Sequence, residues 1–460
     1  MAGVRQTLLP DDPVARALTY STMGFALANG VFYTVSTLYF TRVVGLAPTT
    51  VGLGLGIAGG VGVASAYGAG RLADRVGAHR VLLWGTTVMA LAMLAYQLAA
   101  SAVVFTAIAC LAVGGRAANG SARSAILAVW YTGPDRVDVR ARLRVVTNVF
   151  IGLGTVVAGA ALLIDTAAAY HVAMAAVGGL LLLATVPVAL LPRRVPELVA
   201  RLTASARLAL ADGGGAAGDE GGGVPADGGG AAPGTQADAG TRRAVRGPSP
   251  LRDRTYVASV ACNAVVALHF GLQTVGVPLW IASTEAPTVM VSVLLVLNTV
   301  LVALFQVRAA RGTDDVRFAG ITVRRASWLL AFACLAYALA GYGSVVVACV
   351  LLVVAGLAHT AGEVLGEGGG WGMAFELADP RSAGAYQGLS QTGYAVASMV
   401  SPVLVTATAI DHGSAGWAVL GVVFLAGGAG AAAVAGHAAR TRTAPDAPGP
   451  VAQVTAPATR

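Results

Sequence analysis

Long apolar stretches alternate with short polar ones along most of the chain. Twelve of them are long enough to span a membrane, because about 20 apolar residues cross a bilayer as a helix. They cover residues 15–40, 48–69, 81–100, 102–125, 145–164, 172–191, 255–280, 288–307, 324–341, 345–365, 386–410 and 415–437. The pattern predicts an all-α integral membrane protein with twelve transmembrane helices.

The longest polar interruption, residues 193–254, divides these spans six and six. Its centre consists almost entirely of Gly, Ala, Asp and Pro, and such a segment buries too little apolar surface to offset its chain entropy. We therefore expect two pseudo-symmetric six-helix bundles, residues 1–192 and 255–439, joined by a disordered cytoplasmic linker. A cytoplasmic tail, residues 440–460, follows. Many secondary transporters are built from paired halves of this kind.

Composition supports a membrane protein over a soluble one. Hydrophobic residues make up 56% of the chain and charged residues only 11%, whereas soluble domains carry about 25% charged residues. All 30 basic residues are Arg, and nearly all fall in loops on the side of the two termini. The positive-inside rule then places both termini in the cytoplasm. The Gly-rich, Ala-rich and Lys-free composition indicates a GC-rich bacterial genome, so we expect the protein in a bacterial inner membrane.

The same features argue against several other functions. The net charge of +8 is spread over short loops beside the spans, which does not indicate nucleic-acid binding. The four cysteines lie inside apolar stretches without CxxC spacing, so we expect small apolar packing residues. No HExxH motif or His/Cys cluster occurs. We expect a monomer with no catalytic residues, no resident metal and no cofactor.

One short loop, between the second and third apolar stretches, contains a specific motif. It reads "GAGRLADRVGAHR", from Gly68 to Arg80, and fits the pattern Gly-x-x-x-Asp-Arg-x-Gly-x-x-Arg. This loop resembles motif A of the major facilitator superfamily. The matching residues are Gly70, Asp74, Arg75, Gly77 and Arg80.

The resemblance implies that this loop acts as a conformational switch. Asp74 is expected to accept hydrogen bonds from Arg75 or Arg80, or to lie at the N-terminus of the eleventh helix, across the interface between the halves, where the helix dipole favours an anion. Ala78 and His79 depart from the basic residues usual in the motif. A simple topological role of the arginines is the alternative.

The fourth span carries a second match. The stretch "LAVGGRAANGSARSA" places Arg116 and Gly120 as in motif B of the superfamily, with Asn119 beside them. The family ties this Arg to proton coupling, and an intramembrane Arg is a functional candidate in its own right. The alternative is that Arg116 extends its side chain to the cytoplasmic surface. The fifth span lacks the Gly-Pro motif C typical of drug antiporters, so the resemblance to that group is incomplete.

Cavity-facing residues follow from the family's arrangement, in which helices 1, 4, 7 and 10 line the central cavity. The resemblance implies that the polar residues of these helices face the substrate. The first helix supplies a pair four residues apart, and so does the seventh. The expected cavity residues are Asn29, Tyr33, Asn119, Asn263, His269 and Gln273.

Glu363 and His359, four residues apart in the tenth span, are the candidate proton carriers. Burial disfavours the charged form of a carboxyl group, and intramembrane acids often serve as proton relays. The alternative is that Glu363 lies at the cytoplasmic mouth and only bonds a neighbouring helix.

These observations favour a secondary transporter driven by the proton gradient. The few polar groups in an apolar cavity favour efflux of a small apolar or amphipathic compound, such as a drug or secondary metabolite. Proton-coupled uptake of a nutrient is the first alternative. A membrane-embedded enzyme with His359 and Glu363 as acid and base is a remote one, because a nucleophile or metal set is missing.

Overall fold

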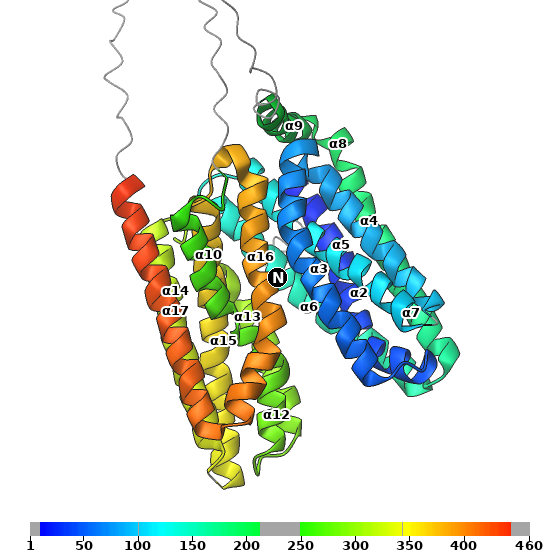
Figure 1. Cartoon of the computed structure of the whole chain (residues 1–460), viewed down its shortest axis with the longest axis vertical. Coiled ribbons are helices and arrows are strands. Elements are labelled where there is room, and N and C mark those ends of the chain that lie inside the picture. The colour runs from blue at the N-terminus through cyan, green and yellow to red at the C-terminus, as the bar shows by residue number, and fades with distance from the viewer. Residues whose placement is uncertain (1–9, 100, 212–248, 343, 443–460) are drawn as a thin grey trace, which may run out of the picture.

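The computed structural model describes residues 10–99, 101–211, 249–342 and 344–442. Every regular element in these ranges is a helix. Figure 1 shows that the helices form two upright groups, one built from the first half of the chain and one from the second.

The first group contains six spans joined by short connections. They are α2 (Pro13–Leu38, continued by the π-helix η1, Tyr39–Val43), α3 (Pro48–Val76), α4 (Ala78–Ala95, continued by the 3-10 helix η2, Tyr96–Leu98), α5 (Ala102–Trp130), α6 (Pro134–Ile164) and α7 (Ala167–Ala189). Two further helices follow, α8 (Leu191–Arg194) and α9 (Pro196–Ala211).

The second group also contains six spans, of which the first is interrupted. That span consists of α10 (Arg254–Ala267), α11 (His269–Gly271), the π-helix η4 (Leu272–Gly276) and α12 (Val277–Ala282). The others are α13 (Val289–Ala309), α14 (Val316–Ala340), α15 (Val345–Glu376), α16 (Ala383–Val405, preceded by η5, Pro380–Ser382, and continued by η6, Thr406–Ile410) and α17 (Gly413–Arg442).

The helix α2 is a more polar span than the rest. Eleven helices of the described residues are long and apolar enough to cross a membrane, and α2 is not among them. It completes the twelve spans of the fold. Its polar side chains bond to its own backbone: Thr19 and Thr22 donate to the carbonyls of Ala15 and Leu18 at 2.8 and 2.7 Å. Such internal bonds let polar residues lie in a membrane helix. The predicted twelve-helix, all-α membrane fold is confirmed.

Each helix group has its own apolar core. In the first group, the rings of Tyr39, Phe40, Tyr96 and Phe105 lie in one buried cluster. The large buried side chains of the second group, including Trp417, belong to a separate cluster. Because each core closes on itself, the two halves can move relative to each other without unfolding either.

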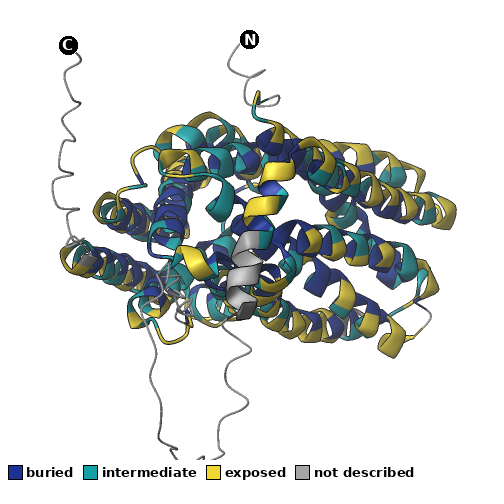
Figure 2. Cartoon of the chain, turned by 90° about the horizontal axis from the view of Figure 1, so that it is seen from above, coloured by how far each residue is buried: buried dark blue, intermediate teal, exposed yellow. Residues whose placement is uncertain are grey.

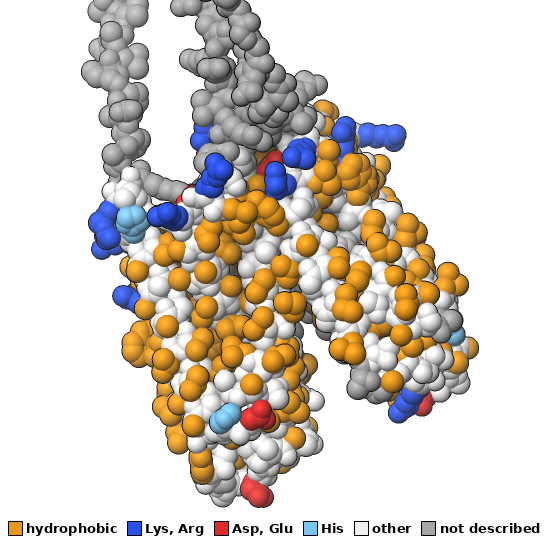
Figure 3. Space-filling model, viewed as in Figure 1, with side chains coloured by type: hydrophobic (Ala, Val, Ile, Leu, Met, Phe, Trp, Pro, Cys, Tyr) orange, Lys and Arg blue, Asp and Glu red, His pale blue; other side chains and the backbone are white. Residues whose placement is uncertain are grey.

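A third apolar cluster joins the halves at one end of the molecule. We call this end the α9 side, because α9 lies there (Figure 1). The cluster is built mostly from the first half, but Ala310, Trp371 and Phe375 of the second half belong to it. Figure 3 shows that the halves separate toward the opposite end, where a deep cleft opens between them. The structure is therefore closed on the α9 side and open on the other.

The flanks of both groups present apolar side chains outward. Leu163, Val156 and Val103 are at least three-quarters exposed, with exposed fractions of 90, 75 and 78%. Figure 2 shows the exposed residues on the outer surfaces and the buried ones between the helices. A surface of this kind suits contact with lipid.

The start of the segment expected to be a disordered linker, 193–254, is helical. There α9 packs its apolar side chains, Leu198 and Leu202, into the cluster that joins the halves. The polar appearance of this segment in the sequence comes from its other face, which includes the ion pair between Glu197 and Arg201. Residues 212–248, the middle of the predicted linker, and residues 443–460, most of the predicted tail, lie outside the described residues.

Candidate functional site between the two halves

Arg144 and Glu363 form an ion pair across the interface between the halves. Nη2 of Arg144, on α6, lies 3.0 Å from Oε1 of Glu363, on α15. Asn298 of α13 donates from Nδ2 to the other carboxylate oxygen of Glu363 at 2.7 Å. The Glu363 side chain is only 2% exposed, so two protein partners replace the water that would otherwise solvate its charge.

Further charges follow this pair toward the α9 side. Arg136, Arg140 and Arg144 are four residues apart on α6 and therefore lie on one face. Arg136 forms an ion pair with Glu376 at 3.3 Å, and Glu367 lies within electrostatic reach of Arg140 and Arg144. We call this set the α6–α15 ladder: Arg136, Arg140, Arg144, Glu363, Glu367 and Glu376.

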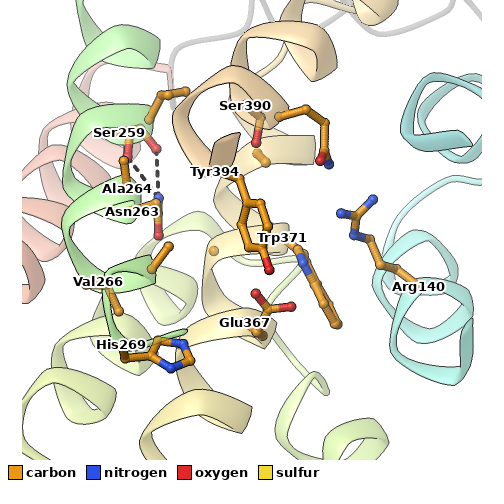
Figure 4. Close-up of a pocket in the computed structure, with 16 residues that line it drawn as sticks. Arg140, Ser259, Asn263, Ala264, Val266, His269, Glu367, Trp371, Ser390 and Tyr394 are labelled. Atoms are coloured by element: carbon orange, nitrogen blue, oxygen red, sulfur yellow. Dashed lines mark hydrogen bonds between the residues drawn. The ribbon is translucent and has the colours of Figure 1, made fainter. Parts of the chain in front are cut away.

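A cavity of about 210 Å³ adjoins the ladder. Arg123, Arg140 and Arg144 line it from the first half, with Trp371 and Tyr394 from the second. The guanidinium of Arg140 lies over the Trp371 ring at 5.3 Å from its centre. In Figure 4, Arg140 points from α6 toward Trp371 and Tyr394, and the Tyr394 hydroxyl points toward Glu367.

A chain of three polar rings runs through the second half beside Glu363. Nε2 of His359 lies 3.3 Å from Nδ1 of His269, and Nδ1 of His359 lies 3.4 Å from the Tyr337 hydroxyl. His269 also lines a cavity at the interface (Figure 4). The four-residue spacing in the sequence relates His359 to Glu363 and His269 to Gln273. It does not predict the contact between the two histidines, which joins two different spans.

Arg116 lies in a second, more apolar cavity of about 200 Å³. It donates from Nη1 to the Tyr33 hydroxyl at 2.7 Å, and Asn29 lines the same cavity. The other lining residues are mostly apolar or aromatic, among them Phe32, Met93 and Tyr96. Arg116 thus faces this cavity, and its bond to Tyr33 holds it there.

Asn119 supports another side chain instead of facing a cavity. It is buried, donates to Thr86 Oγ1 at 2.6 Å and accepts from Nη2 of Arg123 at 2.7 Å. Asn119 does not line the cavities described above, and its predicted cavity position stays a prediction. One helical turn further along α5, Arg123 is the residue that reaches the cavity.

The two remaining candidates lie on the seventh span. Asn263 lines the interface cavity beside Glu367 and donates to the Ser259 carbonyl at 2.9 Å (Figure 4). Gln273 lies half-buried in the π-helix η4. The cavity position of Gln273 stays a prediction.

Asp74 lies at the N-terminus of α16, in the second half. Its two carboxylate oxygens accept from the backbone N–H groups of Gly384 and Ala385, each at 2.7 Å. The sequence left two partners open for Asp74: Arg75 or Arg80, and the N-terminus of the eleventh span. The structure contains the second arrangement. Gly70 makes it possible, because a Cβ there would overlap the Gly384 carbonyl and lie 2.7 Å from the Gly388 Cα.

The other motif residues shape the turn between α3 and α4. Gly77 ends α3 with φ +94, a left-handed conformation that other residues rarely adopt. Arg75 and Arg80 are exposed, and the ion pairs found among the described residues do not include them. His79, in place of a basic residue, is buried.

The comparison with protein families decides the membership of this chain. The profile of the Major Facilitator Superfamily matches residues 18–402. The chain belongs to the major facilitator superfamily. Family and fold together point to a transporter that acts on small molecules within the lipid bilayer, and not to an enzyme.

Solved structures of other superfamily members share this transporter's fold. A bacterial homologue of the iron transporter ferroportin, in an outward-facing state, has a TM-score of 0.64 at 14% identity, covering 91% of this chain and 98% of that one. The proton:xylose symporter XylE has 0.60 at 12%, covering 91% and 94%. The human organic anion transporter MFSD10 (TETRAN) has 0.59 at 17%, covering 92% and 100%. The search of curated proteins gave no match.

Several site residues of this superfamily member escaped the sequence analysis. The fifth apolar stretch begins at residue 145, which predicts a loop position for Arg140 and Arg144, whereas α6 begins at Pro134. The spacing of four between Arg136, Arg140 and Arg144 was the available signal. The same spacing relates Glu363 to Glu367 in the tenth span.

Metal binding has no obvious place in this part of the protein. No group of three or more His, Cys, Asp or Glu side chains within the described ranges is arranged to hold a metal ion. The expected independence from metals and cofactors stays a prediction.

Proposed function

We propose that this transporter exports a small amphipathic compound in exchange for protons, by alternating access. The observation that carries the proposal is the ion pair between Arg144 and Glu363. It connects the halves on the closed α9 side, and Glu363 must be deprotonated to make it. Protonation of Glu363 removes one charge of the pair and leaves the partly buried Arg144, 23% exposed, without this counter-ion, which is costly.

This cost couples the proton to the movement. When Glu363 takes up a proton from the open side, its ion pair with Arg144 is lost, and the halves can separate on the α9 side. His269 lines the interface cavity, and His359 lies between His269 and Tyr337. These rings therefore offer a route for the proton. Arg116 would sense substrate in the apolar cavity through Tyr33.

We infer the direction of transport from the arrangement of the basic residues. Arg side chains gather at the α9 end of the face shown in Figure 3, so the positive-inside rule predicts that this side is cytoplasmic. The structure then corresponds to an outward-open state in a bacterial inner membrane, with both termini inside and a monomer as the working unit. Entry of a proton from outside would open the cytoplasmic side for substrate, which is the order needed for export.

Transport by purified protein in liposomes tests the proposal. An imposed pH gradient should drive uptake of amphipathic dyes or antibiotics into liposomes that are acidic inside. Glu363→Gln should abolish the response to the gradient while preserving exchange of labelled for unlabelled substrate, because the neutral side chain mimics the protonated state. Glu285→Gln, at an exposed loop position, is the matched control.

Two results would contradict this assignment. Proton-driven transport that is unchanged in Glu363→Gln would exclude Glu363 as the coupling group. Accumulation of substrate together with protons, instead of against them, would establish uptake, the alternative direction.

A further inference from the structure

We propose that the substrate carries an acidic group, a carboxylate or phosphate-like anion on an apolar body, and that Arg123, Arg140 and Arg144 bind this group. The inference rests on the proposed transport function and specifies the class of its substrate. It follows from the charges, the free hydrogen-bonding capacity and the layout of the two cavities.

The interface between the halves has more positive than negative charge. Four guanidinium groups, those of Arg116, Arg123, Arg140 and Arg144, lie at or near the two cavities. Two carboxylates, Glu363 and Glu367, lie among them. With His269 and His359 neutral, the charge amounts to +2, and buried charge of one sign is costly unless it is paired.

Most of these arginines have no carboxylate partner. Among the ion pairs of the described residues, only Arg144 of this group occurs, with Glu363. Arg123 is bonded to Asn119, a neutral group, at 2.7 Å. Nε of Arg144 is buried and has no hydrogen-bond partner in the described structure. A ligand anion would supply the acceptors that the protein does not.

Aromatic rings hold the guanidinium groups in place. Arg123 lies over Phe25 at 5.5 Å, Arg140 over Trp371 at 5.3 Å and Arg144 over Phe270 at 5.3 Å. Stacking covers a face of each guanidinium and leaves the N–H groups at its edge for hydrogen bonds. Each edge makes one such bond to a protein side chain: Arg123 to Asn119, Arg140 to Ser124 and Arg144 to Glu363. This edge is the part that bonds carboxylate and phosphate oxygens.

One face of α5 connects the basic cavity with the apolar one. Ala112 and Arg116 line the apolar cavity, and Gly120, Arg123 and Leu127 line the basic cavity. These positions are three or four residues apart, so they form a continuous stripe on the helix. An amphipathic anion can place its acidic group at the basic cavity and its apolar body along the stripe toward Arg116.

Binding of three matched fluorescent probes tests the charge preference without transport. Pyrenebutanoate, pyrenebutanol and pyrenebutylammonium share one apolar body and differ in charge. Energy transfer from tryptophan to pyrene, measured with the full chain in an uncharged detergent, gives a Kd for each. We expect the anion to bind about tenfold more tightly than the alcohol, the gain of one good charged contact, and the cation to bind most weakly.

Variants of Arg123 locate the site, because this residue has no carboxylate that its loss would leave unpaired. Arg123→Gln should weaken binding of the anion about tenfold and leave the alcohol unchanged, while Arg123→Lys should keep most of the preference. Arg311→Gln, an exposed loop position, should change nothing.

Other outcomes would overturn the inference. An anion that binds no better than the alcohol, a cation that binds best, or an Arg123→Gln variant that weakens all three probes equally would each do so. Selective anion binding by a protein that shows no proton-driven transport would contradict the proposed function and leave this inference standing.

Discussion

The contribution of the ion pair between Arg144 and Glu363 to stability depends on both partners. Removing Arg144 leaves the Glu363 carboxylate, 2% exposed, without its cation, and removing Glu363 leaves the partly buried Arg144, 23% exposed, without its counter-ion. Breaking a buried ion pair from one side costs about 3–5 kcal/mol, whereas replacing both members can be close to neutral. Asn298, which also bonds Glu363 at 2.7 Å, remains available to a glutamine in the same place.

A double-mutant cycle at this pair should therefore show strong coupling. We expect Arg144→Gln to lower the free energy of unfolding by about 3 kcal/mol. The double variant with Glu363→Gln should lose less than the sum of the single changes, by about 1–3 kcal/mol. Unfolding followed by thermal shift or denaturant in detergent measures this. Additive losses would mean that the two side chains do not interact in solution.

At the scale of elements, the sequence predicted the spans well and their ends poorly. Apolar runs identify the part of a helix that faces lipid. They predict a loop for the arginines just before residue 145, whereas α6 continues through these residues for three further turns as a charged helix on the α9 side. The motif around Asp74 was predictable because glycine spacing and the acid are local features. The bond between His359 and His269 was not, since it depends on how two spans pack.

The contact between Asp74 and α16 is an element-scale lock on the closed α9 side. An Asn at this position keeps one acceptor and loses the charge that the helix N-terminus favours. Asp74→Asn should cost the closed state about 0.5–2 kcal/mol, which shifts its population by roughly two- to thirtyfold. The protein should insert normally and transport more slowly.

Transport rates and surface expression, measured together, check this prediction. Asp411→Asn, an exposed position in the loop before α17, provides the matched control. Normal transport by Asp74→Asn would reduce the loop to a topological role.

At the scale of the whole molecule, two separate cores with one shared cluster predict rigid movement of the halves. Labels at positions 135 and 311, on the α9 side, should move apart when the halves rock. Labels at positions 163 and 279, on the open side, should approach each other at the same time. All four positions are exposed, so labelling should not disturb packing.

Distances between spin labels, measured in the Glu363→Gln variant and in the unmodified protein, check this movement. The four native cysteines must first be replaced, and each of them lies within a span. Because Gln imitates the protonated acid, the variant should populate the state that is open on the α9 side. Distances that change in the same direction at both ends would contradict a rocking movement.

The α6–α15 ladder has a consequence for the solution that surrounds the protein. Its outer pair, Arg136 with Glu376, is partly exposed at 17 and 23% of the two side chains, whereas Glu363 at the inner end is 2% exposed. Dissolved ions screen accessible charges over about 8 Å at physiological strength and affect buried ones much less. Salt in the compartment that the α9 side faces should therefore weaken the contact between the halves there, beginning with the pair of Arg136 and Glu376. Salt in the other compartment should have no such effect. The transporter would then respond to ionic strength on one side of the membrane alone.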